Sequence, residues 1–401
     1  MSDRRRFALP LILSITAILP PILLHVSDWF YHIIGSQHPS HFLGLISFSI
    51  LTTACALITM ARSAGKRKRA FQVFAALLWM FLALSVADLI LYQMTAPYTT
   101  PAGWRVSDPT LRFRYKPYVQ WEGWFLGDQT HWDGREKRFV QYKMDRNGFR
   151  NATDLQSAEI VCVGDSFTVA GSTGDSAYPS ILSRLTGYSV ANLGRGSYST
   201  QQELEVLRRY GVALNPRILV WQIFEGNDLQ ESASYEDWRN GKTRSALKEV
   251  HRDYKIAVKQ ILNRSIILRG LRRLLMPSRM QFGYEPMGSP VRVSQHPGWR
   301  LLKKSLTQGI ALAKTQRIRT VLIFFPCKAS LYKPKAQRPG MADLLRQFAK
   351  ERGIDFVDMW EIYRMQYLQS GTINYWFNDS HISDDGCRLA AQILAQEILD
   401  K

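Results

Sequence analysis

Three long apolar stretches dominate the first quarter of the chain. They cover Phe7–Val26, Phe42–Met60 and Phe71–Tyr92, and each is almost free of charge. Each has the length of about 20 residues that a helix needs to cross the hydrocarbon core of a bilayer. The pattern predicts three transmembrane helices, and the two later stretches argue against a removable signal peptide.

The charges around these stretches indicate their orientation. Arg4–Arg6 precede the first stretch, and Lys and Arg crowd residues 62–69, whereas residues 27–41 contain neither. By the positive-inside rule, the N-terminus and the second loop lie in the cytoplasm. An odd number of spans then places everything after Tyr92 in the periplasm or outside the cell, and makes the chain an integral protein of the inner or plasma membrane in contact with the lipid bilayer.

The pattern changes twice after the apolar region, which we assign to residues 1–95. Residues 96–150 begin with a linker rich in Pro and Thr and continue with aromatic and charged residues in alternation, punctuated by glycines. This alternation favours short strands, so we expect a β-rich lead-in. Residues 151–401 alternate short apolar segments with amphipathic ones and form the third region.

The third region reads as strands separated by helices. Predicted strands are Ile160–Val163, Ser189–Asn192, Ile218–Phe224, Thr320–Phe325 and Asp355–Val357, and predicted helices are Tyr178–Leu185, Gln201–Tyr210, Trp299–Gln316, Met341–Glu351 and Asp384–Leu399. Such alternation predicts an α/β fold, a parallel sheet covered by helices on both faces. In these folds ligands bind at the carboxyl ends of the strands.

A basic insertion interrupts this alternation at about 232–298. Residues 235–300 hold 14 Lys/Arg and five Asp/Glu, and Leu247–Met276 reads as one helix. The helix either packs one face and exposes the other, or forms a cap that binds anionic glycan or lipid headgroups.

Chemically active residues follow the strands. Gly164–Ser166 comes directly after the first strand, whereas a second Gly-Asp-Ser at Gly174–Ser176 has no apolar strand before it. Only the first copy has the context that presents a serine as a nucleophile. Gly194 follows the second strand, where an unobstructed N–H suits an oxyanion, and Gly226–Asp228 follows the third, where the Asn227 amide offers a further donor. Turn glycines and an Asx-turn are the structural alternatives.

The last such group is Asn378–His381, just before the C-terminal helix. A serine is a poor nucleophile until a histidine accepts its proton, and the histidine needs an acceptor to fix its tautomer. Asp379, two residues before His381, suits that role, although a lone histidine beside an aspartate on the surface is the plainer interpretation.

These four groups, in this order, resemble the blocks of the SGNH/GDSL hydrolase superfamily. The resemblance spans roughly residues 140–400 and implies a three-layer α/β/α, flavodoxin-like domain. It implies that Ser166 is the nucleophile, that His381 is the general base and acid, and that Asp379 orients His381. The oxyanion hole would comprise the N–H groups of Ser166 and Gly194 and the amide of Asn227.

Further details of the resemblance concern the supporting residues. Gly164, Asp165 and Asp228 belong to the matching blocks. The commoner family spacing, Asp-x-x-His, would place Asn378 at the acid position, and the Asp-x-His found here resembles the alginate O-acetyltransferase branch. Phe324–Tyr332 is similar to the same branch, so Lys328 is a candidate contact for an anionic sugar, with a solvated loop lysine as the alternative.

Composition narrows the function classes. The formal net charge of +19 suits anionic polymers or membrane surfaces, and no zinc-finger or RNA-binding signature accompanies it, so no nucleic acid partner is expected. The four cysteines are widely spaced, which favours buried apolar side chains over a disulfide or metal framework. No cofactor or metal is expected.

The sequence predicts a membrane-anchored serine esterase, of the deacetylase type, that acts outside the cytoplasm on acylated envelope glycan. An O-acetyltransferase of an envelope polysaccharide is one alternative, because hydrolysis and transfer share an acyl-enzyme; it would need a membrane partner that delivers the acyl group. A non-catalytic protein that binds glycan or assembles the envelope is the other.

Overall fold

The computed structural model describes residues 104–125, 138–242 and 282–400, together with the single residues 69, 72, 76 and 83. All strands and helices below belong to one compact unit, residues 100–243 and 279–401. The first two predicted membrane spans lie outside the described residues, as does the third apart from three single positions. Within the described part, no helix combines the length and apolarity needed to cross a membrane.

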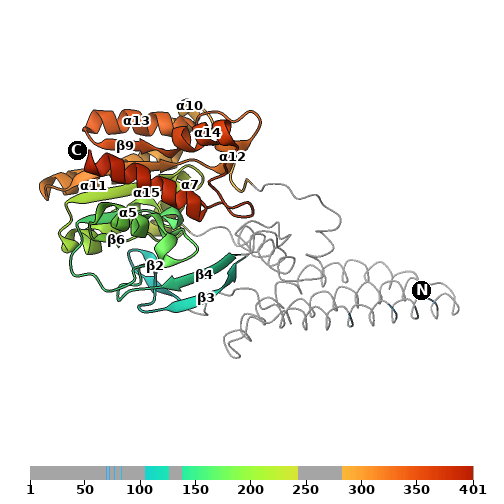
Figure 1. The fold of residues 1–401 in the computed structure, drawn as a ribbon, viewed down its shortest axis with the longest axis horizontal. Helices are drawn as coiled ribbons and strands as arrows, with labels where there is room; N and C mark the ends of the chain where they lie inside the picture. Colours follow the sequence, from blue (N-terminus) through green and yellow to red (C-terminus); the bar gives the residue numbers. More distant parts are fainter. Residues whose placement is uncertain are drawn as a thin grey trace, which may run out of the picture. The chain divides into compact units, whose positions relative to one another are not determined.

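A five-stranded parallel sheet forms the centre of the unit (Figure 1). Its strands are β5 (Ile160–Val163), β6 (Val190–Asn192), β7 (Ile218–Phe224), β8 (Arg319–Phe325) and β9 (Asp355–Asp358). Their order in the sheet is β6-β5-β7-β8-β9, and every neighbouring pair is parallel. The order reverses between β5 and β7, which is the point where flavodoxin-like folds bind ligands.

Helices cover both faces of the sheet. They are α4 (Ser166–Val169), α5 (Tyr178–Thr186), α6 (Thr200–Val206), α7 (Asp228–Arg239), α10 (Pro290–Gln295), α11 (Pro297–Thr315), α12 (Lys328–Tyr332), α13 (Gly340–Arg352), α14 (Met359–Ser370) and α15 (Asp384–Leu399), with short turns η1 (Gly174–Ser176), η2 (Leu207–Gly211) and η3 (Val212–Leu214). The predicted three-layer α/β/α fold with a parallel sheet is confirmed.

A hydrophobic core lies on each face of the sheet, and the alternation of side chains along the strands explains both. In β5, Val161 and Val163 pack with residues of α6, α7, α11 and α13, whereas Ile160 and Cys162 pack with residues of α5, α14 and α15. All four side chains are buried. Because successive side chains of a strand point to opposite faces, a continuous apolar run is what a strand covered on both sides requires.

The lead-in forms two antiparallel hairpins, as the alternation of aromatic and charged residues predicted. β1 (Arg105–Asp108) pairs with β2 (Arg112–Tyr115), and β3 (Gln120–Phe125) pairs with β4 (Arg138–Lys143). The Tyr198 hydroxyl and the Gln202 amide donate to backbone carbonyls of the first hairpin. The backbone N–H of Gln141 in β4 donates to the carbonyl of Ser172 at 2.9 Å. Both hairpins are therefore bonded to the α/β layers.

Two long helices, α7 and α14, fall where no helix was predicted. Their sequences mix polar and apolar residues, and each buries only a few of its side chains. The periodic apolar stripe that marks an amphipathic helix is therefore weak. The flanks of the predicted insertion are helical, since α7 extends to Arg239 and α10 begins at Pro290, and the predicted basic helix lies outside the described residues.

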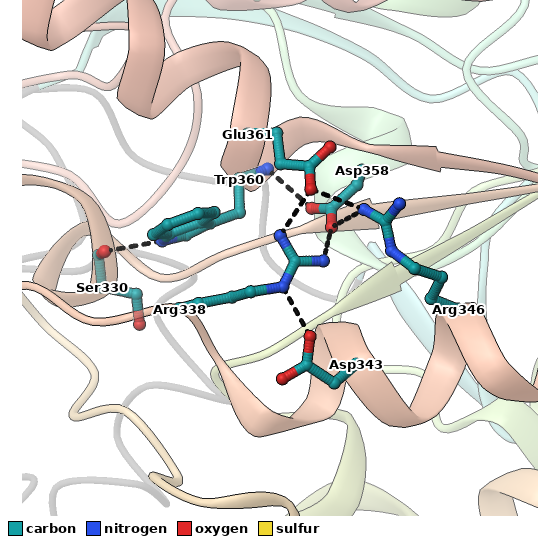
Figure 2. Close-up of polar contacts among 7 residues, drawn as sticks. All are labelled: Ser330, Arg338, Asp343, Arg346, Asp358, Trp360 and Glu361. Atoms are coloured by element: carbon teal, nitrogen blue, oxygen red, sulfur yellow. Dashed lines mark hydrogen bonds and ion pairs between the residues drawn. The ribbon is translucent and has the colours of Figure 1, made fainter.

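An ion-pair network fixes the turn after β9 (Figure 2). The buried Asp358 carboxylate accepts hydrogen bonds from Arg338 and Arg346, and both guanidinium groups also pair with Glu361. Trp360 in the same turn donates its indole N–H to the carbonyl of Ser330 in α12 at 2.8 Å. This last bond joins α12 to the start of α14, directly after the carboxyl end of β9.

Candidate active site

Ser166 begins α4 immediately after β5. The Asp165 carboxylate caps this helix and accepts a hydrogen bond from the backbone N–H of Phe167 at 2.8 Å. At position 164 a Cβ would lie 2.3 Å from the Gln222 side-chain oxygen and 2.4 Å from the Thr168 hydroxyl. Only glycine fits there, because the chain turns tightly against β7 as it leaves the strand.

The structure brings Ser166, His381 and Asp379 together. His381 Nε2 lies 2.8 Å from Ser166 Oγ, and His381 Nδ1 lies 2.6 Å from Asp379 Oδ1. The Asp379 side chain is fully buried, and that of His381 is 25% exposed. Asp379 is therefore the carboxylate that contacts the imidazole. This Ser-His-Asp arrangement is able to activate a hydroxyl as a nucleophile.

The second Gly-Asp-Ser lies in a different environment. Ser176 ends the short turn η1, and its hydroxyl donates to the carbonyl of Thr173 at 3.1 Å and accepts from the Thr173 N–H. It acts as a local cap and contacts no histidine among the described residues.

The position of Lys328 contradicts the prediction that it contacts the substrate. Lys328 is only 1% exposed, and its ammonium donates to the carbonyls of Trp376 and Phe377 at 2.9 and 3.0 Å. It is neither a solvated loop residue nor open to a sugar. Because these carbonyls directly precede Asn378–His381, the lysine anchors the loop that carries the imidazole and its acid.

The prediction that the N–H of Gly194 binds the oxyanion is also corrected. Its backbone N–H donates to the Asn192 side chain at 3.0 Å, and the residue is buried against Thr168. Gly196 lies beside the serine, because a Cβ added there would be 3.6 Å from Ser166 Cβ. Ser197 follows in a left-handed conformation with φ of 65°, which marks a tight turn of the loop beside Ser166.

Asn227 caps the start of α7 without the side-chain hydrogen bond of an Asx-turn. Its amide nitrogen donates to the Glu231 carboxylate at 3.1 Å, and a polar contact with Asn227 also stabilises the ionised form of Asp165. The amide is thus shared between protein carboxylates at the switch point of the sheet. Its role in binding an oxyanion stays a prediction.

Several carboxyl groups lie buried behind this site. Asp228 accepts a hydrogen bond from the Phe224 N–H, and Glu203 accepts one from the Trp221 indole, each at 2.8 Å. Burial raises the pKa of Asp165, Glu203 and Asp228 above their ordinary values, and repulsion between neighbouring carboxylates adds to this for Glu203 and Asp228. The predicted supporting residues Asp165 and Asp228 therefore act within the protein, as a helix cap and as a backbone acceptor.

Glu231 is expected to make the stability of the folded protein depend on pH. Burial, with the nearby Asp165 charge, raises its pKa to about 8. The folded state then holds a proton that the unfolded state loses near pH 4.5, so the stability from Glu231 is full below that pH and declines until about pH 8. We expect Glu231→Gln to remove a slope of at most about 1.4 kcal/mol per pH unit from the free energy of unfolding.

Urea unfolding of the full chain at several pH values between 5 and 8 measures this slope. Asp165, Glu203 and Asp228 contribute slopes of the same sign, so the difference between wild type and variant isolates Glu231. The exposed residue Asp237 on the same helix supplies the control, Asp237→Asn, which should keep the wild-type slope. An unchanged slope in Glu231→Gln would contradict the proton assignment.

One residue of the site is absent from the sequence prediction. Arg138, the first residue of β4, donates from its guanidinium to Asp379 Oδ2. It lies in the lead-in, away from the strand ends of the parallel sheet where the other site residues were predicted, and no local pattern marks it. Among the described ranges, no group of three or more His, Cys, Asp or Glu side chains is arranged to hold a metal ion.

Comparison with known proteins identifies the family of this chain. The model of the GDSL-like Lipase/Acylhydrolase family matches residues 162–389, which is more than half of the chain. No curated protein sequence matches the chain significantly.

Solved structures with a similar fold include two esterases and one further hydrolase. The acetyl xylan esterase AlAXEase has 14% identity and a TM-score of 0.38, covering 60% of this chain and 99% of its own. A catalytic mutant of an acetylxylan esterase from Geobacillus stearothermophilus has 15% identity and a TM-score of 0.36, covering 61% and 95%. An alpha/beta hydrolase from the metagenome of Lake Arreo, Spain, has 16% identity and a TM-score of 0.34, covering 62% and 99%.

These likenesses are too distant to carry an argument about substrate, so the assignment rests on the family model. By that match, the chain belongs to the GDSL-like lipase/acylhydrolase family of ester-hydrolysing enzymes.

Proposed function

We propose that this protein is a membrane-anchored serine esterase of the deacetylase type that acts outside the cytoplasm on acylated envelope glycan. The hydrogen-bonded series Ser166–His381–Asp379 carries the catalytic part of the proposal. Its members come from β5–α4 and from the loop before α15, more than 200 residues apart, yet their reacting atoms lie within hydrogen-bond distance. Such a meeting of nucleophile, base and acid is the arrangement that acyl transfer requires.

The mechanism follows from these contacts. His381 Nε2 accepts the proton as Ser166 Oγ attacks the ester carbonyl, and the imidazolium is stabilised by Asp379. Collapse of the tetrahedral intermediate breaks the bond to the alcohol, which takes the proton from Nε2. Water, deprotonated by the same nitrogen, then attacks the acyl-serine, releasing the carboxylic acid and restoring Ser166.

The oxyanion formed in these steps needs donors beside Ser166. The Ser166 N–H is one, because it lies at the first position of α4 and has no partner within the helix. We assign the second to the loop at Gly196 in place of Gly194, whose N–H is already used. The third is Asn227, whose amide must exchange the Glu231 carboxylate for the oxyanion. Each such donor contributes about 10²- to 10³-fold to kcat.

Location and substrate class rest on the sequence. The three apolar spans anchor the chain. The positive charges before the first span and between the second and third spans favour a catalytic unit outside the cytoplasm. The net charge of +19 favours an anionic surface such as the acidic glycans and lipid headgroups of an envelope.

Labelling by a fluorophosphonate tests the catalytic part. We expect the full chain in detergent to react with the probe, and mass spectrometry to find the phosphonyl group on Ser166. No reaction of the folded chain would support the non-catalytic alternative. Acetate release from acetylated envelope glycans then tests the substrate class, and transfer to an added glycan hydroxyl in place of release would indicate the O-acetyltransferase.

A reporter fused after Tyr92 tests the location. Alkaline phosphatase, which is active only outside the cytoplasm, should be active in this fusion, and green fluorescent protein should fluoresce when fused between the second and third spans. The opposite pattern would overturn the orientation.

A further inference from the structure

The hairpin of β3 and β4 lies outside the residues matched by the family model, yet it reaches the acid of the site. Arg138, the first residue of β4, pairs with Phe125, the last residue of β3. Further along β4, the carbonyl of Gln141 accepts a hydrogen bond from the Arg150 guanidinium at 2.7 Å. The same guanidinium donates to the carbonyl of Val169 in α4 at 2.6 Å. The Arg150 side chain therefore ties β4, the strand that carries Arg138, to the segment that follows Ser166.

The two oxygens of Asp379 are divided between two partners. Oδ1 accepts from the His381 side chain and backbone, and Oδ2 accepts from the Arg138 guanidinium. The guanidinium lies over two rings, 4.3 Å from the centroid of Trp376 and 4.9 Å from that of Phe125. Only 12% of the Arg138 side chain is exposed, and none of the Asp379 side chain. The contact is thus largely shielded from water and from added salt.

A buried carboxylate needs a compensating charge. Burial alone raises the pKa of Asp379, but the charges and hydrogen bonds of His381 and then of Arg138 outweigh it and hold this pKa well below its ordinary value. Among these partners the guanidinium is the permanent cation, since arginine stays protonated throughout the working pH range.

We propose that Arg138 is a positioning residue for the reaction: it fixes the rotamer of Asp379 and offsets its charge, so that His381 stays neutral and aimed at Ser166. The lead-in hairpin is then part of the active site. This inference rests on the proposed esterase function. It assigns the arginine no contact with substrate, because its action passes through Asp379.

The pH dependence of the reaction provides the readout. Two other titratable groups interact with these residues: Asp165 from the β5–α4 turn interacts with His381, and Tyr142 from β4 interacts with Arg138 and Asp379. Lys328 from α12 donates to the carbonyls of Trp376 and Phe377. Removing the guanidinium leaves the Asp379 charge to act on His381 alone, which favours the protonated imidazole.

We expect Arg138→Met in the full chain to lower kcat for p-nitrophenyl acetate by about 10- to 100-fold with little change in KM. The acid limb of its pH–rate profile should move to higher pH by about 0.5 to 1 unit. Arg138→Lys should restore part of kcat and the wild-type acid limb. Lys143→Met, which removes an exposed positive charge from the same strand, is the matched control and should behave as wild type.

A double variant separates positioning from general stability. If Arg138 acts through Asp379, Arg138→Met should cost nothing further in kcat when Asp379 is already Asn. Additive losses, or a wild-type kcat and acid limb in Arg138→Met, would overturn the inference while leaving the esterase intact. Should Arg138→Met fail to fold, Arg138→Gln, which retains a hydrogen-bond donor but no charge, carries the same test. A wild-type chain without turnover or fluorophosphonate labelling would overturn both proposals.

Discussion

Ser166→Ala is expected to lower ester turnover by about 10⁴- to 10⁶-fold and to abolish fluorophosphonate labelling. Among the described residues, the Ser166 hydroxyl is the group placed to form the acyl-enzyme, with its oxygen 2.8 Å from His381 Nε2. Alanine removes the nucleophile and leaves the helix cap from Asp165 and the surrounding core unchanged. Steady-state kinetics with p-nitrophenyl acetate, with circular dichroism to confirm the fold, measures the effect.

Ser176→Ala is the matched control for this experiment. It changes the serine of the other Gly-Asp-Ser, whose hydroxyl is bonded within its own turn, so turnover should stay close to wild type. If the two variants lost activity equally, or if Ser166→Ala kept the wild-type rate, Ser166 would not be the nucleophile.

Asp379→Asn is expected to lower kcat by about 10⁴-fold while KM changes little. The carboxylate accepts from the imidazole at 2.6 Å, which fixes the tautomer that leaves Nε2 free to accept the serine proton. An amide at this position favours the wrong tautomer and does not stabilise the imidazolium. Fluorophosphonate labelling of this variant should be slow but detectable, because the serine hydroxyl is still present.

The control for this variant is Asp385→Asn, which changes an exposed acid at the start of α15 that pairs only with the exposed Arg388 in the described structure. Asp385→Asn should keep the wild-type kcat. A wild-type kcat in Asp379→Asn would remove this residue from the mechanism and return attention to its neighbour Asn378, whose side chain is buried in the same loop.

Much of the fold was predictable because its signals are local. The strands β5 and β7 and the helix α15 have the bounds that their apolar patterns predicted. A strand buried on both faces must be apolar throughout, and a helix that packs on a sheet must repeat its apolar residues, so these requirements are written in neighbouring positions. The strand-end position of Ser166 followed from the same reasoning.

The contacts of each strand-end residue depend on the packing of the residues around it and could not be predicted from the local sequence. Gly194 and Gly196 are both plausible oxyanion donors in sequence, and only the packing of Asn192 and Thr168 shows that the N–H of Gly194 is already used. Lys328 looked like a surface residue, because no local pattern distinguishes a buried ammonium bonded to two carbonyls from a solvated one.

The sequence by itself determined the parallel α/β layers, the serine at a strand end and the histidine with an acid two residues before it. Only the tertiary structure decided that Asp379 is the residue that accepts from His381, and that Arg138, 241 residues away in the chain, accompanies it. The physical reason is that secondary structure depends on the spacing of apolar side chains over a few residues, whereas compensation of a buried charge depends on whichever group the fold brings beside it.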